Sequence, residues 1–272
     1  MRTMSRQVCF IVVGVVLIVG FGCRPTVREA GDESQADASS DPQRKKPEES
    51  ESFRAKPSAA SPAVEPKNSG QDAQRKEPKD GGWGYSPKEP GNTSVFGWQL
   101  LALTSAKMAG LQVDRSVITR AGKYLDSAAV HDGTEYAYRR GLGPSASMTA
   151  VGLLCRQYLG VRRDNPMLSG GEKYLLDHLP DEHSLNACYC YYAQHFMHNM
   201  SGYEWDTWNR ATRDLLVRTQ IRDTNSCADG SWDPANDAWG TQGGRLMKTS
   251  LSVLPLQVYY HGFLPLYKPL DW

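Results

Sequence analysis

Hydrophobic residues are unevenly spread along this chain of 272 residues. Residues 1–23 contain a continuous apolar run, residues 24–80 are almost wholly polar, and residues 81–272 mix apolar and aromatic residues at helical spacing. A segment of low hydrophobicity cannot bury enough apolar surface to offset its ordering entropy, so we expect residues 24–80 to be a disordered linker. The pattern therefore predicts a targeting segment, a linker and one folded domain, in that order.

Two kinds of helix are predicted to alternate in the folded domain. The apolar ones begin near Thr93, Ser147 and Thr249 or surround residues 186–200. The amphipathic ones cover residues 117–125, 171–178 and 205–220. An apolar helix must be covered on several sides, whereas an amphipathic helix needs cover on one face only. The order therefore predicts an all-α fold of stacked helical hairpins, about three and a half of them over residues 94–260, with the apolar helices inside.

Three turns of similar sequence precede three of the predicted inner helices. Each begins with Asp-Gly and continues to an aromatic residue, at 80–85, 132–138 and 229–234. Such a turn signal followed by a ring favours a structural role, in which the ring wedges between neighbouring helices. The recurrence indicates a loose internal repeat.

The last of these turns carries a resemblance to a known family. Gln220, followed at a distance by Gly230-Ser231-Trp232, resembles the Gln-to-Trp repeat of the terpenoid cyclase and protein prenyltransferase family, with a longer spacing than usual. The resemblance covers residues 81–265 and is closest to uncharacterised exported repeat proteins of that group. It implies an α/α toroid. Family rings typically close with six hairpins, so three to four imply an open ring with a concave face, or a ring that copies of the chain complete as a homo-oligomer.

The chemistry of that family is only partly matched. The cyclases' Asp-x-Asp-Asp acid motif does not occur in this sequence. The stretch 186–192 resembles the zinc-binding element of the prenyltransferases, but Asn186 stands where an Asp belongs and only Cys188 matches. Lys248 stands where the distant His belongs, and it brings a cation towards a dication unless it turns to solvent. We therefore expect neither zinc nor another cofactor, and lean towards a domain without catalysis.

Two further groups of residues could hold a metal. His195 and His198 lie three apart on a predicted helix, with Cys188 on a similar face, but aromatic residues surround them and favour packing. Asp229, Asp233 and Asp237 lie four apart, but Gly and Pro between them favour turn and capping roles. The four cysteines of the domain are expected to be small buried residues: Cys155, Cys188, Cys190 and Cys227.

The apolar run near the N-terminus is typical of an export signal. As a helix it spans only about 22 Å, short of the roughly 30 Å core of a bilayer. It ends in Gly22-Cys23, which resembles a bacterial lipoprotein processing site, although Gly20 stands where that pattern has a Leu-like residue. We expect lipid attachment at Cys23, and hence an exported lipoprotein anchored to a membrane and facing the periplasm or the cell surface. An uncleaved anchor and simple secretion are the alternatives.

The function expected from these features is binding. We expect no nucleic-acid partner, because the formal net charge of the chain is only +1. We expect the domain to bind a hydrophobic ligand or a protein partner on its concave face, with candidate contacts Tyr191, Tyr192, His195 and Arg245. The alternatives are an enzyme acting on a hydrophobic substrate and a structural protein of the envelope. An aromatic-lined apolar cavity would favour the enzyme. A flat or charged concave face would favour protein binding, and a large exposed apolar patch would favour assembly.

Overall fold

The computed structural model describes residues 81–86, 89–183, 185–259 and 272, all of which belong to one compact unit. Seven α-helices lie within this part of the chain, which confirms the all-α fold class. Their bounds are α3 Thr93–Met108, α4 Arg115–Ala128, α5 Ala146–Tyr158, α6 Pro166–Leu176, α7 Ala187–Met200, α8 Gly202–Thr219 and α9 Gly240–Leu256. The predictions for residues 1–80, including the linker and lipid attachment at Cys23, lie outside the described residues. No helix among the described residues is long and apolar enough to cross a membrane.

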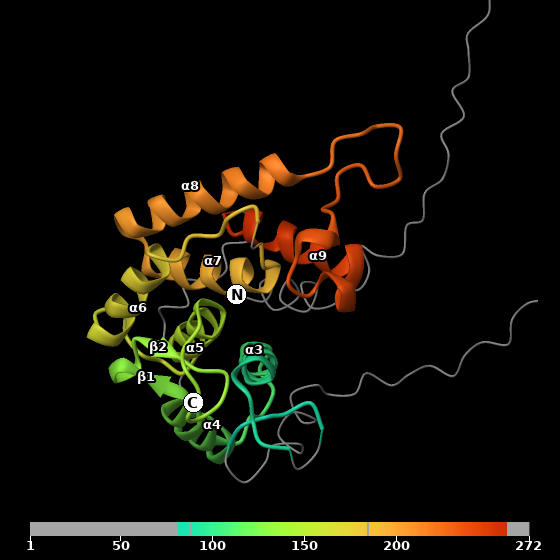
Figure 1. Ribbon diagram of the computed structural model, residues 1–272. Helices are drawn as coiled ribbons and strands as arrows, with labels where there is room; N and C mark the ends of the chain where they lie inside the picture. The colour runs from blue at the N-terminus through green and yellow to red at the C-terminus, as the bar shows by residue number, and fades with distance from the viewer. Residues whose placement is uncertain (1–80, 87–88, 184, 260–271) are drawn as a thin grey trace, which may run out of the picture. The chain divides into compact units, whose positions relative to one another are not determined.

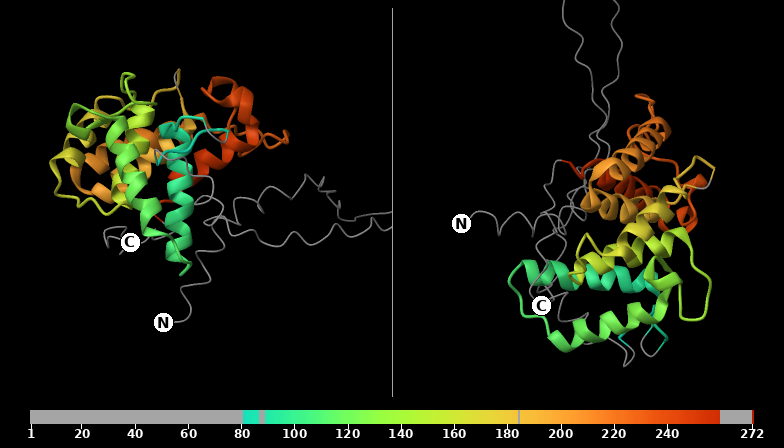
Figure 2. Two further views of the ribbon diagram at one scale, coloured as in Figure 1. Left: turned by 90° about the horizontal axis from the view of Figure 1, so that it is seen from below. Right: turned by 90° about the vertical axis from the view of Figure 1, so that its left-hand side faces the viewer.

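The helices form two layers, as the alternation of apolar and amphipathic segments predicts. Helix α5 packs between α3 and α7, and α7 packs in turn against α9. The outer helices cover this row: α4 lies on α3, α6 on α5, and α8 on α7 (Figures 1 and 2). The described residues thus contain three helical hairpins followed by a single inner helix.

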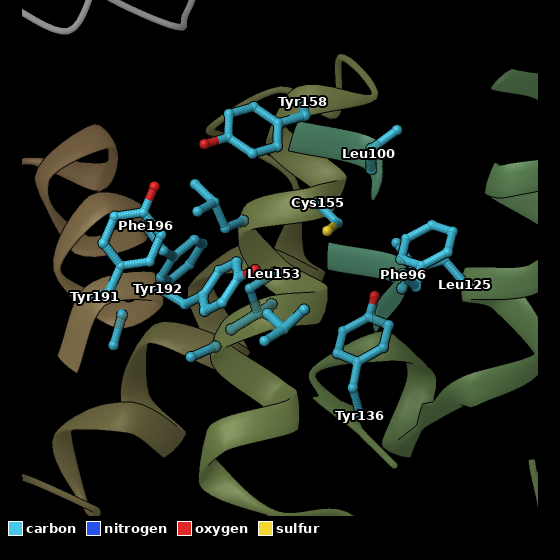
Figure 3. Close-up of a cluster of buried hydrophobic side chains, with 14 of the residues drawn as sticks. Phe96, Leu100, Leu125, Tyr136, Leu153, Cys155, Tyr158, Tyr191, Tyr192 and Phe196 are labelled. Atoms are coloured by element: carbon cyan, nitrogen blue, oxygen red, sulfur yellow. The ribbon is translucent and has the colours of Figure 1, made fainter. Parts of the chain in front are cut away.

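The burial of each helix explains its place in these layers. In the outer helix α4 one stripe is buried, and it is the predicted one: Val117, Ile118, Ala121, Tyr124 and Leu125. The inner helix α5 is buried almost throughout. Figure 3 shows the core between these layers, where Phe96 and Leu100 of α3 lie near Leu153 of α5 and Leu125 of α4. Hydrophobic burial therefore fixes the inner and outer order.

The Asp-Gly turns have the structural role that the sequence predicts. Gly81, Gly133 and Gly230 all have positive φ, between 76° and 83°, a conformation that glycine adopts at little cost. The aromatic residues that follow are buried: Trp83, Tyr136 and Trp232. Tyr136 lies so close to α5 that a Cβ on Gly152 would come within 2.2 Å of its ring.

The second of these turns also contains the small sheet of the described residues. Its strands β1 (Ala129–Val130) and β2 (Glu135–Tyr136) pair antiparallel, with Ala129 opposite Tyr136. The short 3-10 helix η2 (His131–Gly133) connects the two strands. This hairpin presents Tyr136 to α5.

The last inner helix differs from its prediction. We expected it to begin near Thr249, but α9 begins at Gly240 and runs through a kink at Gly244, where φ is 65° and ψ is −172°. The glycines at 243 and 244 suggest a loop from sequence alone. In the structure the first turn of the helix forms before them and is joined to the rest through a backbone conformation that is essentially restricted to glycine.

Candidate ligand pocket

A pocket of about 300 Å³ lies where the N-terminal ends of the four inner helices meet. Its walls come from α3 through Ser94 and Trp98, from α5 through Ser147 and Val151, and from the start of α7. The fourth wall is formed by Gln242, Gly243 and Met247 of α9 and by Trp239 just before it. Because the inner helices run in the same direction, their first turns converge on this one site.

Aromatic rings dominate the surface of the pocket. Tyr189 and Tyr192 of α7 are buried in its wall, whereas Tyr85, Trp98 and Trp239 are between 41% and 68% exposed. Trp98 lies edge-on to Tyr192 at 5.2 Å between ring centroids. Exposed tryptophan and tyrosine rings around an apolar hollow are typical of a binding site for an apolar molecule.

Several polar side chains at the pocket already have hydrogen-bond partners. The Asn186 side-chain oxygen accepts from the backbone N–H of Tyr189, and the side-chain amide donates to the Ser147 hydroxyl at 3.2 Å. The Ser94 hydroxyl donates to Asn92 at 2.8 Å. By contrast, the buried hydroxyl of Tyr192 has no hydrogen-bond partner among the described residues. None of the described lining residues is charged, and the Tyr192 hydroxyl is the buried side-chain oxygen among them that lacks a partner.

Cys188 is a thiol in this pocket. Burial, and to a smaller extent the nearby Asp237, raises the pKa of Cys188 to about 11, and Lys248 opposes the shift. The group is therefore protonated near neutral pH. Because the thiolate is the nucleophile and the metal ligand, Cys188 is poorly suited to either role in this environment.

Beside the pocket, Lys248 and Asp237 form a buried ion pair. The Lys248 ammonium lies 2.7 Å from the Asp237 carboxylate, with side-chain exposures of 1% and 0%. The same carboxylate accepts from the backbone N–H of Ala187 at 2.8 Å and from that of Trp239 at 2.9 Å. The pair thus ties α9 to the start of α7. Lys248 does not turn to solvent, which sequence reasoning left open.

These contacts show that the positions resembling a zinc site do not fit zinc. Asn186 caps α7 with its side-chain oxygen and uses its amide on Ser147. Lys248 places an ammonium, not a ligand, next to Cys188 and Asp237. No group of three or more His, Cys, Asp or Glu residues within the described ranges is placed to hold a metal ion.

Of the four predicted ligand contacts, Tyr192 lines the pocket and the other three do not. Tyr191 is buried and stacks beneath Trp98 at 5.6 Å. His195 is buried one turn further along α7, edge-on to Tyr191 at 4.7 Å, where burial, aided by His198, lowers its pKa to about 4. Arg245 is exposed and donates to the Ser231 hydroxyl at 3.2 Å.

The remaining candidates have structural roles. His195 packs in the core, and His198 lies edge-on to Trp205 at 5.0 Å, as the packing interpretation predicts. Asp229 accepts from the backbone of Asp223, and Asp233 caps the short 3-10 helix η3 (Pro234–Asn236), which confirms the turn and capping roles. The four cysteines are free. Two are buried and Cys188 is half-buried, but Cys227 is exposed, so the prediction of burial was wrong for it.

Sequence reasoning missed several residues of the pocket. Trp98 follows Gly97 inside an apolar helix, and nothing in that pattern distinguishes a pocket ring from a core ring. Asp237 drew attention only as part of an acidic cluster, although it is the partner of Lys248. Lys248 within a predicted inner helix was a usable signal, because a buried ammonium needs a carboxylate nearby.

The comparisons with known proteins add no family. No protein-family model matches this chain, and no curated protein matches it either.

Proposed function

We propose that this chain is an exported, lipid-anchored α/α repeat domain that binds a small apolar molecule in the pocket between its inner helices, without catalysing a reaction. The observation that carries the proposal is the pocket itself: aromatic walls, no charge among the described lining residues, and about 300 Å³ of space. That volume is at the lower end for small-molecule sites. Such a hollow favours a small ligand over a protein partner, which would need a broader face.

The enzyme on a hydrophobic substrate is the second candidate, and the aromatic lining is the observation that favours it. Against it, the described lining residues offer no carboxylate or imidazole to transfer a proton, and the Cys188 thiol is protonated near neutral pH. Lys248 and Asp237 neutralise one another in a buried pair. Binding without turnover is therefore the simpler proposal.

Filling the pocket tests the proposal. N-phenyl-1-naphthylamine, an uncharged dye that fluoresces in apolar surroundings, should bind the wild-type chain at one saturable site. Ser94→Trp places a ring in the pocket and should weaken that binding at least tenfold. Ser105→Trp lies on the same helix α3 away from the pocket and serves as the matched control. Unchanged dye affinity in a folded Ser94→Trp variant would contradict the proposed site.

The anchoring part of the proposal has a separate test. Cells that express the wild type and Cys23→Ser should be labelled with a fatty-acid probe and then fractionated. We expect label and membrane retention in the wild type and neither in the variant, because a single attachment cysteine is proposed. Label that persists in Cys23→Ser would show that the attachment site is wrong.

A further inference from the structure

The described walls of the pocket carry no charge that would compensate a charged ligand. The charges that act on Cys188 in the wall belong to Lys248 and Asp237, which are paired with each other. Burying an unpaired carboxylate or ammonium in such surroundings weakens binding by roughly a thousandfold or more.

The converging helix ends do not change this balance. The dipole of each helix end raises the affinity for an anion by only about two- to fivefold. Asn92, Ser145 and Asn186 already accept from N–H groups in three of these first turns. The dipoles therefore favour a partial negative charge, such as a carbonyl oxygen, more readily than a full anion.

The hydroxyl of Tyr192 indicates where such an oxygen would lie. Tyr192 is 2% exposed, and its hydroxyl has no partner among the described residues. It approaches α3 closely: a Cβ on Gly97 would lie 3.0 Å from this oxygen and 2.5 Å from Val151, which lines the pocket. Burial raises the pKa of Tyr192 well above its ordinary value, so the group stays a protonated donor.

A phenylalanine at this position would fill the same space without a buried donor that costs stability. The hydroxyl itself is closed off from solvent, so a ligand could bond to it only after a neighbouring side chain shifts. Trp98 is 41% exposed, lies edge-on to Tyr192 and stacks on Tyr191 at 5.6 Å, so a shift of this ring is the movement that the inference requires.

From these observations we infer that the pocket binds an uncharged, flat, mainly apolar molecule that presents one acceptor oxygen, of the carbonyl type, to the Tyr192 hydroxyl. The inference rests on the proposed function and specifies its ligand. A flat ligand fits because aromatic rings pack well face to face or edge to face with Trp98, Tyr189 and Trp239.

Three probes of nearly the same shape separate the outcomes. They are 2-acetylnaphthalene, which carries a ketone oxygen, 2-isopropenylnaphthalene, in which a methylene group replaces that oxygen, and 2-naphthoate, which is an anion. Each is titrated against the wild-type chain loaded with N-phenyl-1-naphthylamine, and its affinity is read from displacement of the dye. We expect the ketone to bind about five- to tenfold more tightly than the alkene, as one hydrogen bond to a buried donor predicts. We expect 2-naphthoate to bind at least tenfold more weakly than the ketone.

Tyr192→Phe removes the donor and keeps the ring. In this variant the preference for the ketone should disappear while the affinity for the alkene stays within about twofold. Tyr203→Phe, on the exposed face of α8, is the matched control and should keep the preference.

Several results would overturn the inference. Equal binding of ketone and alkene by the wild type would do so, and so would a preference for the ketone that survives in Tyr192→Phe. Tightest binding by 2-naphthoate would instead indicate an anion site. Dye that binds but is displaced by none of the three probes contradicts this inference alone. A chain that binds no dye contradicts the proposed function, and the inference falls with it.

Discussion

The inner helices α7 and α9 lie side by side, yet they are held in different ways. In α7, 12 of 14 residues are buried and the Asn186 side chain caps the first turn. In α9 only five of 17 residues are buried, no side chain caps its start, and Gly244 breaks its regular geometry. Helix α7 has α5 on one side and α9 on the other, whereas α9 is the last inner helix of the described row.

This difference shows that the central and the last helix of the described row are stabilised by different kinds of contact. A central helix gains stability from many small packing contacts, so no single one of them decides its position. Helix α9 depends on a few specific contacts: the Lys248–Asp237 pair, and the Gln194 amide that donates to the carbonyl of Pro255 at 3.4 Å. Because α9 also forms one wall of the pocket, these contacts connect stability to the proposed binding site.

The largest expected effect comes from breaking the buried ion pair. Lys248→Met leaves the Asp237 carboxylate buried without its counter-charge, and we expect a loss of about 3–5 kcal/mol in the free energy of unfolding. Urea denaturation followed by circular dichroism measures it. Arg245→Met, three residues away on the exposed surface, should change stability by no more than about 0.5 kcal/mol. A loss below about 1 kcal/mol for Lys248→Met would show that α9 is held by packing, like α7.

A second effect, specific to α7, depends on pH. Because burial lowers the pKa of His195 to about 4, the folded chain keeps this imidazole neutral while the unfolded chain protonates it below about pH 6.5. Stability from this group is fully present above pH 6.5 and is lost as the pH falls towards 4. The loss is about 3 kcal/mol at its largest.

His195→Gln removes that titration. The difference in unfolding free energy between wild type and variant, followed from pH 7.5 to 4, should change in favour of the variant as the solution becomes acidic. A difference that stays constant over this range would mean that His195 is accessible to protons in the folded chain.

The smallest expected effects come from two glycines. At Gly244 an added Cβ meets no neighbouring atom, but the backbone conformation is one that side chains rarely adopt, so Gly244→Ala should cost about 1–3 kcal/mol. Gly122, inside the outer helix α4, also has open space and ordinary helical geometry, so Gly122→Ala should stabilise the chain by about 0.5–1 kcal/mol. Thermal unfolding of the two variants distinguishes them, because the unfolding temperature should fall for Gly244→Ala and rise for Gly122→Ala. A neutral Gly244→Ala would show that the kink in α9 relaxes readily.

The sequence by itself determined the layers of this fold. Periodicity distinguishes α4, α6 and α8, which hide one stripe, from the inner helices, and that distinction depends on neighbours within two helical turns. The structural role of the Asp-Gly turns before Tyr136 and Trp232 could also be predicted from neighbouring residues alone. Glycine allows the turn, and the aromatic residue that follows it is expected to pack between helices.

Only the tertiary structure decided the site. Tyr191 and Tyr192 are adjacent and chemically alike, yet one lines the pocket and the other supports Trp98, because successive residues of a helix point about 100° apart. Asp237 and Lys248 come from different segments, and their pairing follows from the way α9 packs against the start of α7. A pocket formed by the first turns of four helices is a property of their arrangement, so no single segment of the sequence contains it.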